Sequence, residues 1–133
     1  MNFPSARALL LAFGAAALLP CVQAAPPPPD SAAMLKLADT SGCSQCHQLV
    51  SGAKGPDGKT AIGPAWNDVS AKYSGQANAE NKLVSLVMSG TTPFDRHWKE
   101  KTGTIQMPAN AKVINEADAR LLVQWILKLQ ATK

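Results

Sequence analysis

Two cysteines and a histidine lie close together in the segment CSQCH at residues 43–47. A redox-active dithiol uses this spacing, but it belongs to a βαβ setting that the chain lacks. A zinc site needs a second pair of ligands, and the only other histidine, His97, has no cysteine near it. The third use of the spacing is covalent attachment of haem, in which two thiols add to vinyl groups and the next histidine ligates the iron. The sequence therefore predicts one haem c attached through Cys43 and Cys46, with His47 as an axial iron ligand.

The iron of a haem has a second axial position, and the candidates for it are Met34, Met88, Met107 and His97. Met34 and Met88 lie within helical patterns among apolar residues, where methionine more often fills a core. Met107 precedes Pro108, which favours extended backbone and holds the thioether on a loop. We therefore predict Met107 as the second axial ligand, with His97 as the main alternative.

The start of the chain has the pattern of an export signal. Arg7 precedes an apolar stretch at residues 8–19, which is too short to span a bilayer. Residues 22–24 then supply the residue types that a signal peptidase reads. We predict a cleaved signal peptide over residues 1–24 with the cut after Ala24, a proline-rich spacer over 25–30 and a single domain over 31–133.

Cys21 has a second interpretation, because a cysteine after an apolar stretch can become the lipidated first residue of a lipoprotein. Pro20 stands where such signals place a small residue, which argues against lipidation. We expect Cys21 to leave with the signal peptide, so that the mature chain keeps two cysteines.

The composition and the spacing of apolar residues predict an all-α domain. The chain has 133 residues, 46% of them hydrophobic, and a net charge of +4 without a run of Lys or Arg suited to nucleic acid. Apolar residues recur at the three- and four-residue spacing of a helix in several segments, and no segment has the pattern of a convincing strand. We predict four to five short helices, among them one from a cap at Asp30 or Ser31 to about Asp39, one from about Ala65 to Lys72, one from a cap at Asn78 to Gly90, and one that begins at a cap at Asn115.

The last of these helices has the clearest pattern. Acidic residues follow Asn115, where the positive end of a helix dipole favours them. We interpret Trp125 as part of the helix core, whereas Trp66 and Tyr73 suit either the core or the haem. The predicted buried stripe of this helix is Ala117, Leu121, Leu122, Trp125, Ile126 and Leu129.

Together these motifs resemble the short, single-haem class I cytochromes c of bacterial periplasms. The resemblance covers nearly all of the mature chain, in the order haem motif, Gly-Pro, helix and Met-Pro loop. It is carried by Cys43-x-x-Cys46-His47, Ile62-Gly63-Pro64-Ala65-Trp66, Asn67 to Tyr73, Gly75-Gln76, Met107-Pro108-Ala109-Asn110 and Trp125-Ile126-Leu127.

The resemblance implies the class I cytochrome c fold and two further contacts. The carbonyl of Pro64 is expected to accept the Nδ1 proton of His47, and Trp98 is expected to donate to a haem carboxylate. The segments before Pro64 and Met107 are longer than in the shortest members of the family. Other candidates for the carboxylate contact are Arg96, His97 and Lys99.

A haem with two protein ligands has no vacant position, so its natural work is transfer of one electron. We expect a monomeric periplasmic electron carrier that is not an enzyme and has no transmembrane span. Its expected partners are redox proteins, for which lysines near the haem would favour acidic docking faces. The alternatives are a fixed cytochrome subunit of a larger oxidoreductase and a peroxidase-like enzyme in which His97 acts in place of a bound Met107. The lysines in question are Lys54, Lys59, Lys99, Lys101 and Lys112.

Overall fold

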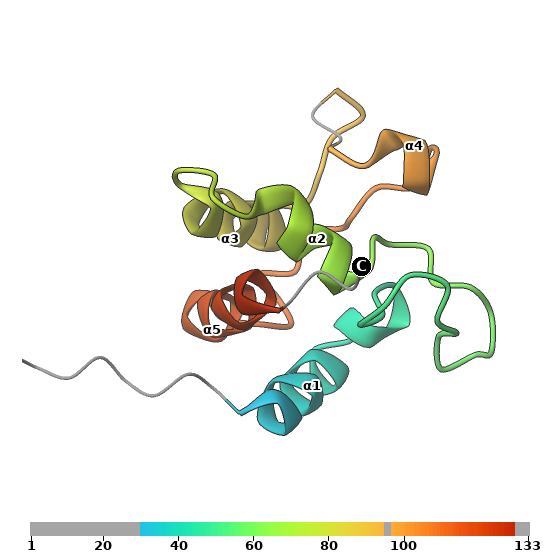
Figure 1. Cartoon of the computed structure of the whole chain (residues 1–133), viewed down its shortest axis with the longest axis horizontal. Coiled ribbons are helices and arrows are strands. Elements are labelled where there is room, and N and C mark those ends of the chain that lie inside the picture. Colours follow the sequence, from blue (N-terminus) through green and yellow to red (C-terminus); the bar gives the residue numbers. More distant parts are fainter. Residues whose placement is uncertain (1–29, 95–96, 130–133) are drawn as a thin grey trace, which may run out of the picture.

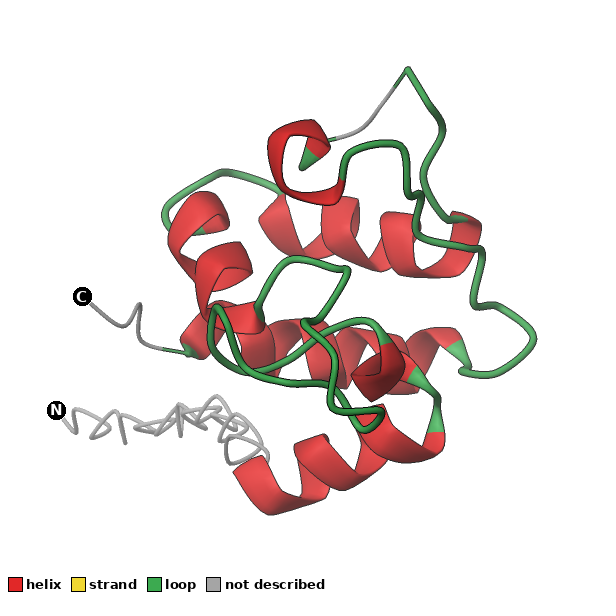
Figure 2. Cartoon of the chain, turned by 90° about the vertical axis from the view of Figure 1, so that its right-hand side faces the viewer, coloured by secondary structure: helices red, strands yellow, loops and turns green. Residues whose placement is uncertain are grey.

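The computed structural model describes residues 30–94 and 97–129, and in these residues the chain forms helices and no strand (Figures 1 and 2). The prediction of an all-α fold with four to five short helices is confirmed. The expected signal peptide with Cys21, the spacer up to residue 29, and Arg96 lie outside the described residues. The elements are α1 (Ser31–Thr40), the 3-10 helix η1 (Cys43–Gln45), α2 (Trp66–Tyr73), α3 (Ala79–Ser89), α4 (Lys99–Thr102) and α5 (Glu116–Lys128).

Two of the helices begin at the side-chain caps expected from the sequence. The carboxylate of Asp30 accepts a hydrogen bond from the backbone N–H of Ala32 at the start of α1. The side-chain oxygen of Asn115 accepts one from the N–H of Asp118, at 2.9 Å, at the start of α5. Each cap satisfies one of the backbone donors that the first turn of a helix leaves unpaired.

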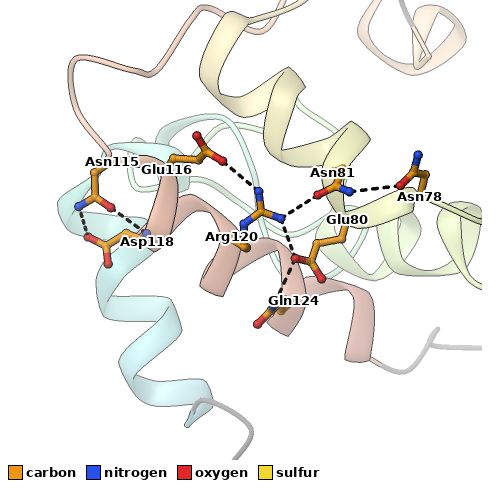
Figure 3. A network of polar contacts seen from close by, with 8 residues as sticks. All are labelled: Asn78, Glu80, Asn81, Asn115, Glu116, Asp118, Arg120 and Gln124. Atoms are coloured by element: carbon orange, nitrogen blue, oxygen red, sulfur yellow. Dashed lines mark hydrogen bonds and ion pairs between the residues drawn. The ribbon is translucent and has the colours of Figure 1, made fainter. Parts of the chain in front are cut away.

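The expected N-cap position of α3 is confirmed at Asn78, but the side chain of this residue does not cap the helix. Asn78 does precede the helix, but its φ is 65° and its side chain makes no bond to the helix backbone. Its side-chain oxygen accepts instead from Nδ2 of Asn81, at 3.2 Å (Figure 3). Asparagine tolerates the left-handed conformation better than most residues, so it serves here as a turn residue.

The core forms where α1, α2 and α3 pack against α5. Trp125 of α5 is buried and meets the ring of Trp66 edge-on, with 5.6 Å between the ring centroids. Its Nε1 also donates to Oγ of Ser31, at 3.1 Å, which ties α5 to the start of α1. The interpretation of Trp125 as a core residue is confirmed.

The buried face of α5 differs in part from the predicted stripe. Ala117 and Leu121 are exposed, Leu121 by 42%. The inward face follows the helical spacing i, i+3, i+4, i+7 instead, because α5 packs against three other helices along that line. Its members are Ala119, Leu122, Val123 and Ile126, with Trp125 beside them.

A polar cluster joins α3 to α5 on their outer side (Figure 3). Arg120 donates to carboxylate oxygens of Glu80 and Glu116, each at 2.9 Å, and to the amide oxygen of Asn81 at 2.8 Å. Gln124 adds a bond to Glu80 at 3.2 Å. The Arg120 guanidinium lowers the pKa of the Glu80 carboxyl below its usual value. Arg120 thus holds the two helices together with bonds that do not involve the apolar core.

Candidate functional site

An almost entirely apolar hollow lies between α2, α3, α5 and the loops around η1 and α4. Residues far apart in the sequence meet in its walls. All six residues predicted for the site line it: Cys43, Cys46, His47, Pro64, Trp98 and Met107.

The two thiols reach the hollow from a single turn of 3-10 helix. Gly42 adopts φ 75° after α1 and redirects the chain into η1. Side chains three residues apart on such a turn lie on the same side, which places Cys43 and Cys46 together. Both are half-buried and neither forms a disulfide, and burial raises the pKa of the Cys43 thiol.

His47 is held by a backbone carbonyl from a distant part of the chain. Its Nδ1 lies 2.8 Å from the carbonyl oxygen of Pro64. Because a carbonyl only accepts hydrogen bonds, Nδ1 carries the proton and Nε2 keeps its lone pair. Burial lowers the pKa of His47, which favours this neutral form, and the ring stacks near Trp66 at a centroid distance of 6.3 Å. The imidazole is therefore prepared to act as a ligand through Nε2.

Gly63 allows this arrangement because nothing larger fits beside the imidazole. A Cβ at this position would lie 2.8 Å from Cε1 of His47 and 2.9 Å from the carbonyl oxygen of Cys46. Its backbone N–H also donates to that same carbonyl, at 2.7 Å. The Gly-Pro pair thus supports both the haem motif and the histidine orientation, a reason that the sequence pattern does not reveal.

Met107 is held on its loop by Thr91, a residue that sequence reasoning missed. The Thr91 N–H donates to the carbonyl of Met107 at 2.9 Å, and the Met107 N–H donates to Oγ1 of Thr91 at 3.0 Å. Gly90, with φ 76°, allows its backbone to lie close to that of the Met107 loop, since a Cβ at Gly90 would lie 2.8 Å from the Met107 carbonyl oxygen. Asn110 adds a bond from Nδ2 to the carbonyl of Val87 in α3, at 3.1 Å. The thioether segment is thus fixed against the end of α3.

The other candidates for the second axial ligand fall into two groups in the described part of the chain. Met34 is buried in the core, and Met88 packs against the core; neither lines the hollow. His97 does line it, and its ring packs edge-on against Tyr73 at a centroid distance of 6.4 Å. The structure therefore leaves Met107 and His97 as the residues able to face a cofactor from this side.

Trp98 lies in the hollow wall just before α4, between two lysines. The Nζ atoms of Lys72 and Lys101 lie 4.2 and 5.5 Å from the centre of the Trp98 ring, within range of cation–π attraction. Lys72 also donates to the carbonyl of His97, and Lys101 forms an ion pair with Asp68 of α2. The inserted segment with α4 is thereby fastened to α2, with Trp98 turned to the hollow.

A site for a metal ion without haem would need a cluster of acidic, cysteine or histidine side chains. Among the described residues, no three side chains of these types come close enough to hold a metal ion. The zinc interpretation of residues 43–47 therefore has no support here, and the hollow is suited to a large apolar cofactor.

Comparison with known proteins identifies the family to which the chain belongs. The family described as Cytochrome c matches residues 33–130. The chain belongs to the cytochrome c family. Cytochrome c-551 of Allochromatium vinosum is 41% identical over 101 residues, which cover 76% of this chain and 90% of that protein. Cytochrome c2 of Rhodocyclus tenuis is 41% identical over 95 residues, covering 71% and 89%. The crystal structure of wild-type Nitrosomonas europaea cytochrome c552 matches with a TM-score of 0.55 at 31% identity, covering 71% of this chain and 96% of that one.

This cytochrome c carries one covalently bound haem c with its iron, and residues 43–47 fit the CxxCH motif. The resemblance to short bacterial class I cytochromes c is confirmed, and these relatives are single-haem electron carriers rather than enzymes. The residues present fit a covalently bound haem. Two free thiols and an imidazole with Nε2 available lie in the apolar walls of the same hollow. Trp66 and Tyr73 belong both to these walls and to the helix core.

Proposed function

We propose that this cytochrome c is an exported carrier of single electrons in which Cys43 and Cys46 attach the haem, and His47 and Met107 ligate its iron. One observation carries the proposal. A single apolar hollow receives both thiols, a histidine whose Nδ1 is bonded to the Pro64 carbonyl, and a thioether on a clamped loop.

Each part of this chain has a separate task in such a carrier. The haem supplies one-electron oxidation and reduction when bound. Pro64 fixes the ring of His47, and Thr91 fixes the backbone of Met107, so that neither ligand needs to move between oxidation states. The apolar walls exclude water, and two protein ligands leave no position for oxygen or peroxide. Trp98 is the proposed donor to a haem carboxylate.

We place the protein in the periplasm as a monomer, with residues 1–24 removed after Ala24 and 25–30 as a spacer. None of the helices in the described part of the chain has the length and apolar content needed to cross a bilayer. The mass of the mature protein purified from the periplasm tests the cut, and addition of a diacylglyceryl group at Cys21 would contradict it.

Its partners are proposed to be redox proteins with acidic docking faces. All five lysines named in the sequence analysis are exposed, but Lys59 and Lys101 are each paired with an aspartate. Lys54, Lys99 and Lys112 make no ion pair within the described residues, so they are the better sources of steering. Electron transfer to an acidic partner should slow as ionic strength rises. A rate that does not change with salt would refute the steering.

Optical spectra test the ligand assignment. The ferric wild type should show the weak red charge-transfer band of an iron–methionine bond, and the ferrous form should not bind carbon monoxide. Met107→Leu should lose the red band and bind carbon monoxide, whereas the control Met88→Leu should behave as the wild type. If the wild type lacks the band and binds carbon monoxide, the carrier assignment fails. His97→Gln then tests the peroxidase-like alternative, and stable copurification of a second protein would indicate a fixed subunit.

A further inference from the structure

Tyr73, the last residue of α2, carries a buried hydroxyl group with no hydrogen-bond partner. The residue is 2% exposed, and its Oη is the only buried side-chain oxygen or nitrogen in the described part of the chain that lacks a partner. Buried polar groups in folded proteins are almost always hydrogen-bonded, so this exception needs an explanation. Because the side chain also lines the hollow, a bound haem is within its reach.

The surroundings of the ring favour a negatively charged partner. Nζ of Lys82 lies 5.6 Å from the centre of the Tyr73 ring, and Nζ of Lys72 lies 4.2 Å from the centre of the neighbouring Trp98 ring. The ring of His97 meets Tyr73 edge-on at 6.4 Å. Two ammonium groups thus lie beside the rings of Tyr73 and Trp98, which line the hollow, and Trp98 adds an N–H donor.

This corner of the hollow, with Tyr73 and Trp98, is separate from the place where the haem is attached. Figures 1 and 2 show α4, next to Trp98, well apart from η1, which carries Cys43. A haem bonded to the protein through its former vinyl groups presents its two carboxylates at another part of its rim. These carboxylates are its only negatively charged substituents, and they match the donors and cations of this corner.

We propose that the Tyr73 hydroxyl donates a hydrogen bond to a carboxylate of the haem. This inference rests on the covalently bound haem of the family and does not depend on which residue is the second axial ligand. The bond holds the carboxylate in its ionised form and draws on its negative charge. A weaker negative charge stabilises ferric iron less, so the bond raises the reduction potential.

The variant Tyr73→Phe removes only the hydroxyl. A hydrogen bond to an ionised carboxylate lowers the pKa of that carboxylate by about one unit, which is roughly a tenfold change in its proton affinity. In the variant we expect the inflection of reduction potential against pH that reports carboxylate ionisation to move up by about one pH unit. The carboxylate bands in redox-difference infrared spectra should shift with it, and the potential at neutral pH should fall.

The wild type provides an independent measurement, because Tyr73 is the only tyrosine of the chain. The ultraviolet resonance Raman spectrum of the protein therefore reports this hydroxyl alone. We expect the pattern of a strong hydrogen-bond donor. The pattern of an acceptor or of an unbonded hydroxyl would overturn the proposal even if the variant folds poorly.

A matched control is Ser70→Ala, which removes another buried hydroxyl from the same helix. Oγ of Ser70 donates to the backbone carbonyl of Leu129 at 2.5 Å and is not part of the hollow wall. Its loss should lower stability without moving the potential inflection. If Tyr73→Phe behaves as this control does, the hydroxyl is bonded to water and the proposal is wrong. A wild type without the red iron–methionine band refutes Met107 ligation but leaves this comparison valid.

Discussion

In the proposed carrier with His47 and Met107 as iron ligands, Thr91→Val should loosen Met107 from the iron by an amount set by one hydrogen bond. Valine keeps the shape of threonine and the backbone N–H that bonds to the Met107 carbonyl, but it removes the hydroxyl that accepts from the Met107 N–H at 3.0 Å. This N–H lies in a half-buried residue. Loss of its acceptor costs about 1–2 kcal/mol. The fraction of molecules with the thioether off the iron should therefore rise about 5- to 30-fold.

Added imidazole measures this fraction, because it binds ferric iron only when the thioether is off. The apparent affinity for imidazole scales with the population that can bind it, so Thr91→Val should bind about 5- to 30-fold more tightly than the wild type. Thr91→Ser keeps the hydroxyl and should stay close to the wild type. An unchanged affinity in the valine variant, with a normal red band, would refute the clamp. Equal gains in both variants would assign the effect to altered packing at this position instead of to the hydroxyl.

Three further predictions concern the haem motif, the polar cluster around Arg120 and the cofactor. Gly63→Ala should destabilise the protein by about 2 kcal/mol, because the added methyl group collides with the imidazole and a backbone carbonyl; denaturant unfolding measures this, and a neutral result would contradict the close packing. Arg120→Gln should lower the melting temperature slightly at neutral pH. The pKa of Glu80 is lowered in the folded protein, so its contribution is present above its unfolded value near 4.5 and disappears as the pH falls through the folded pKa; the difference between variant and wild type should therefore shrink in acid to what the bond from Arg120 to Asn81 contributes, and a difference that is undiminished there would refute the assignment to this ion pair. The double variant Cys43→Ala/Cys46→Ala, made without haem, should lack a sharp thermal transition because the hollow loses its central apolar group, whereas native-like circular dichroism and cooperative unfolding would refute this.

Local sequence signals predicted most of the helices and the attachment motif. Asp30 and Asn115 begin helices through bonds to residues two or three positions away, which a short stretch of sequence specifies. The haem motif is just as local, because its thiols and imidazole belong to one turn. Asn78 shows the limit of such reasoning. The sequence correctly predicts that it precedes a helix, but it does not specify whether the asparagine side chain caps that helix or the residue forms a left-handed turn.

The remaining features depend on packing between distant segments. Leu121 fits a helical stripe as well as Val123 does, and only the placement of three helices around α5 decides which of them is buried. Thr91 bonds to a residue 16 positions later, and the fit of Gly63 against His47 appears only after the chain folds back. The sequence pattern places Tyr73 in either the core or the haem pocket, and its unpaired hydroxyl becomes visible only once its neighbours are in place.

The two segments proposed to ligate the iron are supported by different parts of the chain, which predicts that each can come loose without the other. His47 is fixed by Pro64, in the loop before α2, whereas Met107 is fixed by Thr91 at the end of α3. Arg120 in turn anchors α3 to α5 from outside the hollow. Because the covalent attachment and the histidine lie on the first support, loosening the second should open the iron without releasing the haem. In the proposed carrier, the haem would stay attached while the Met107 loop fluctuates, and the same loop would determine how often the iron is open to external ligands.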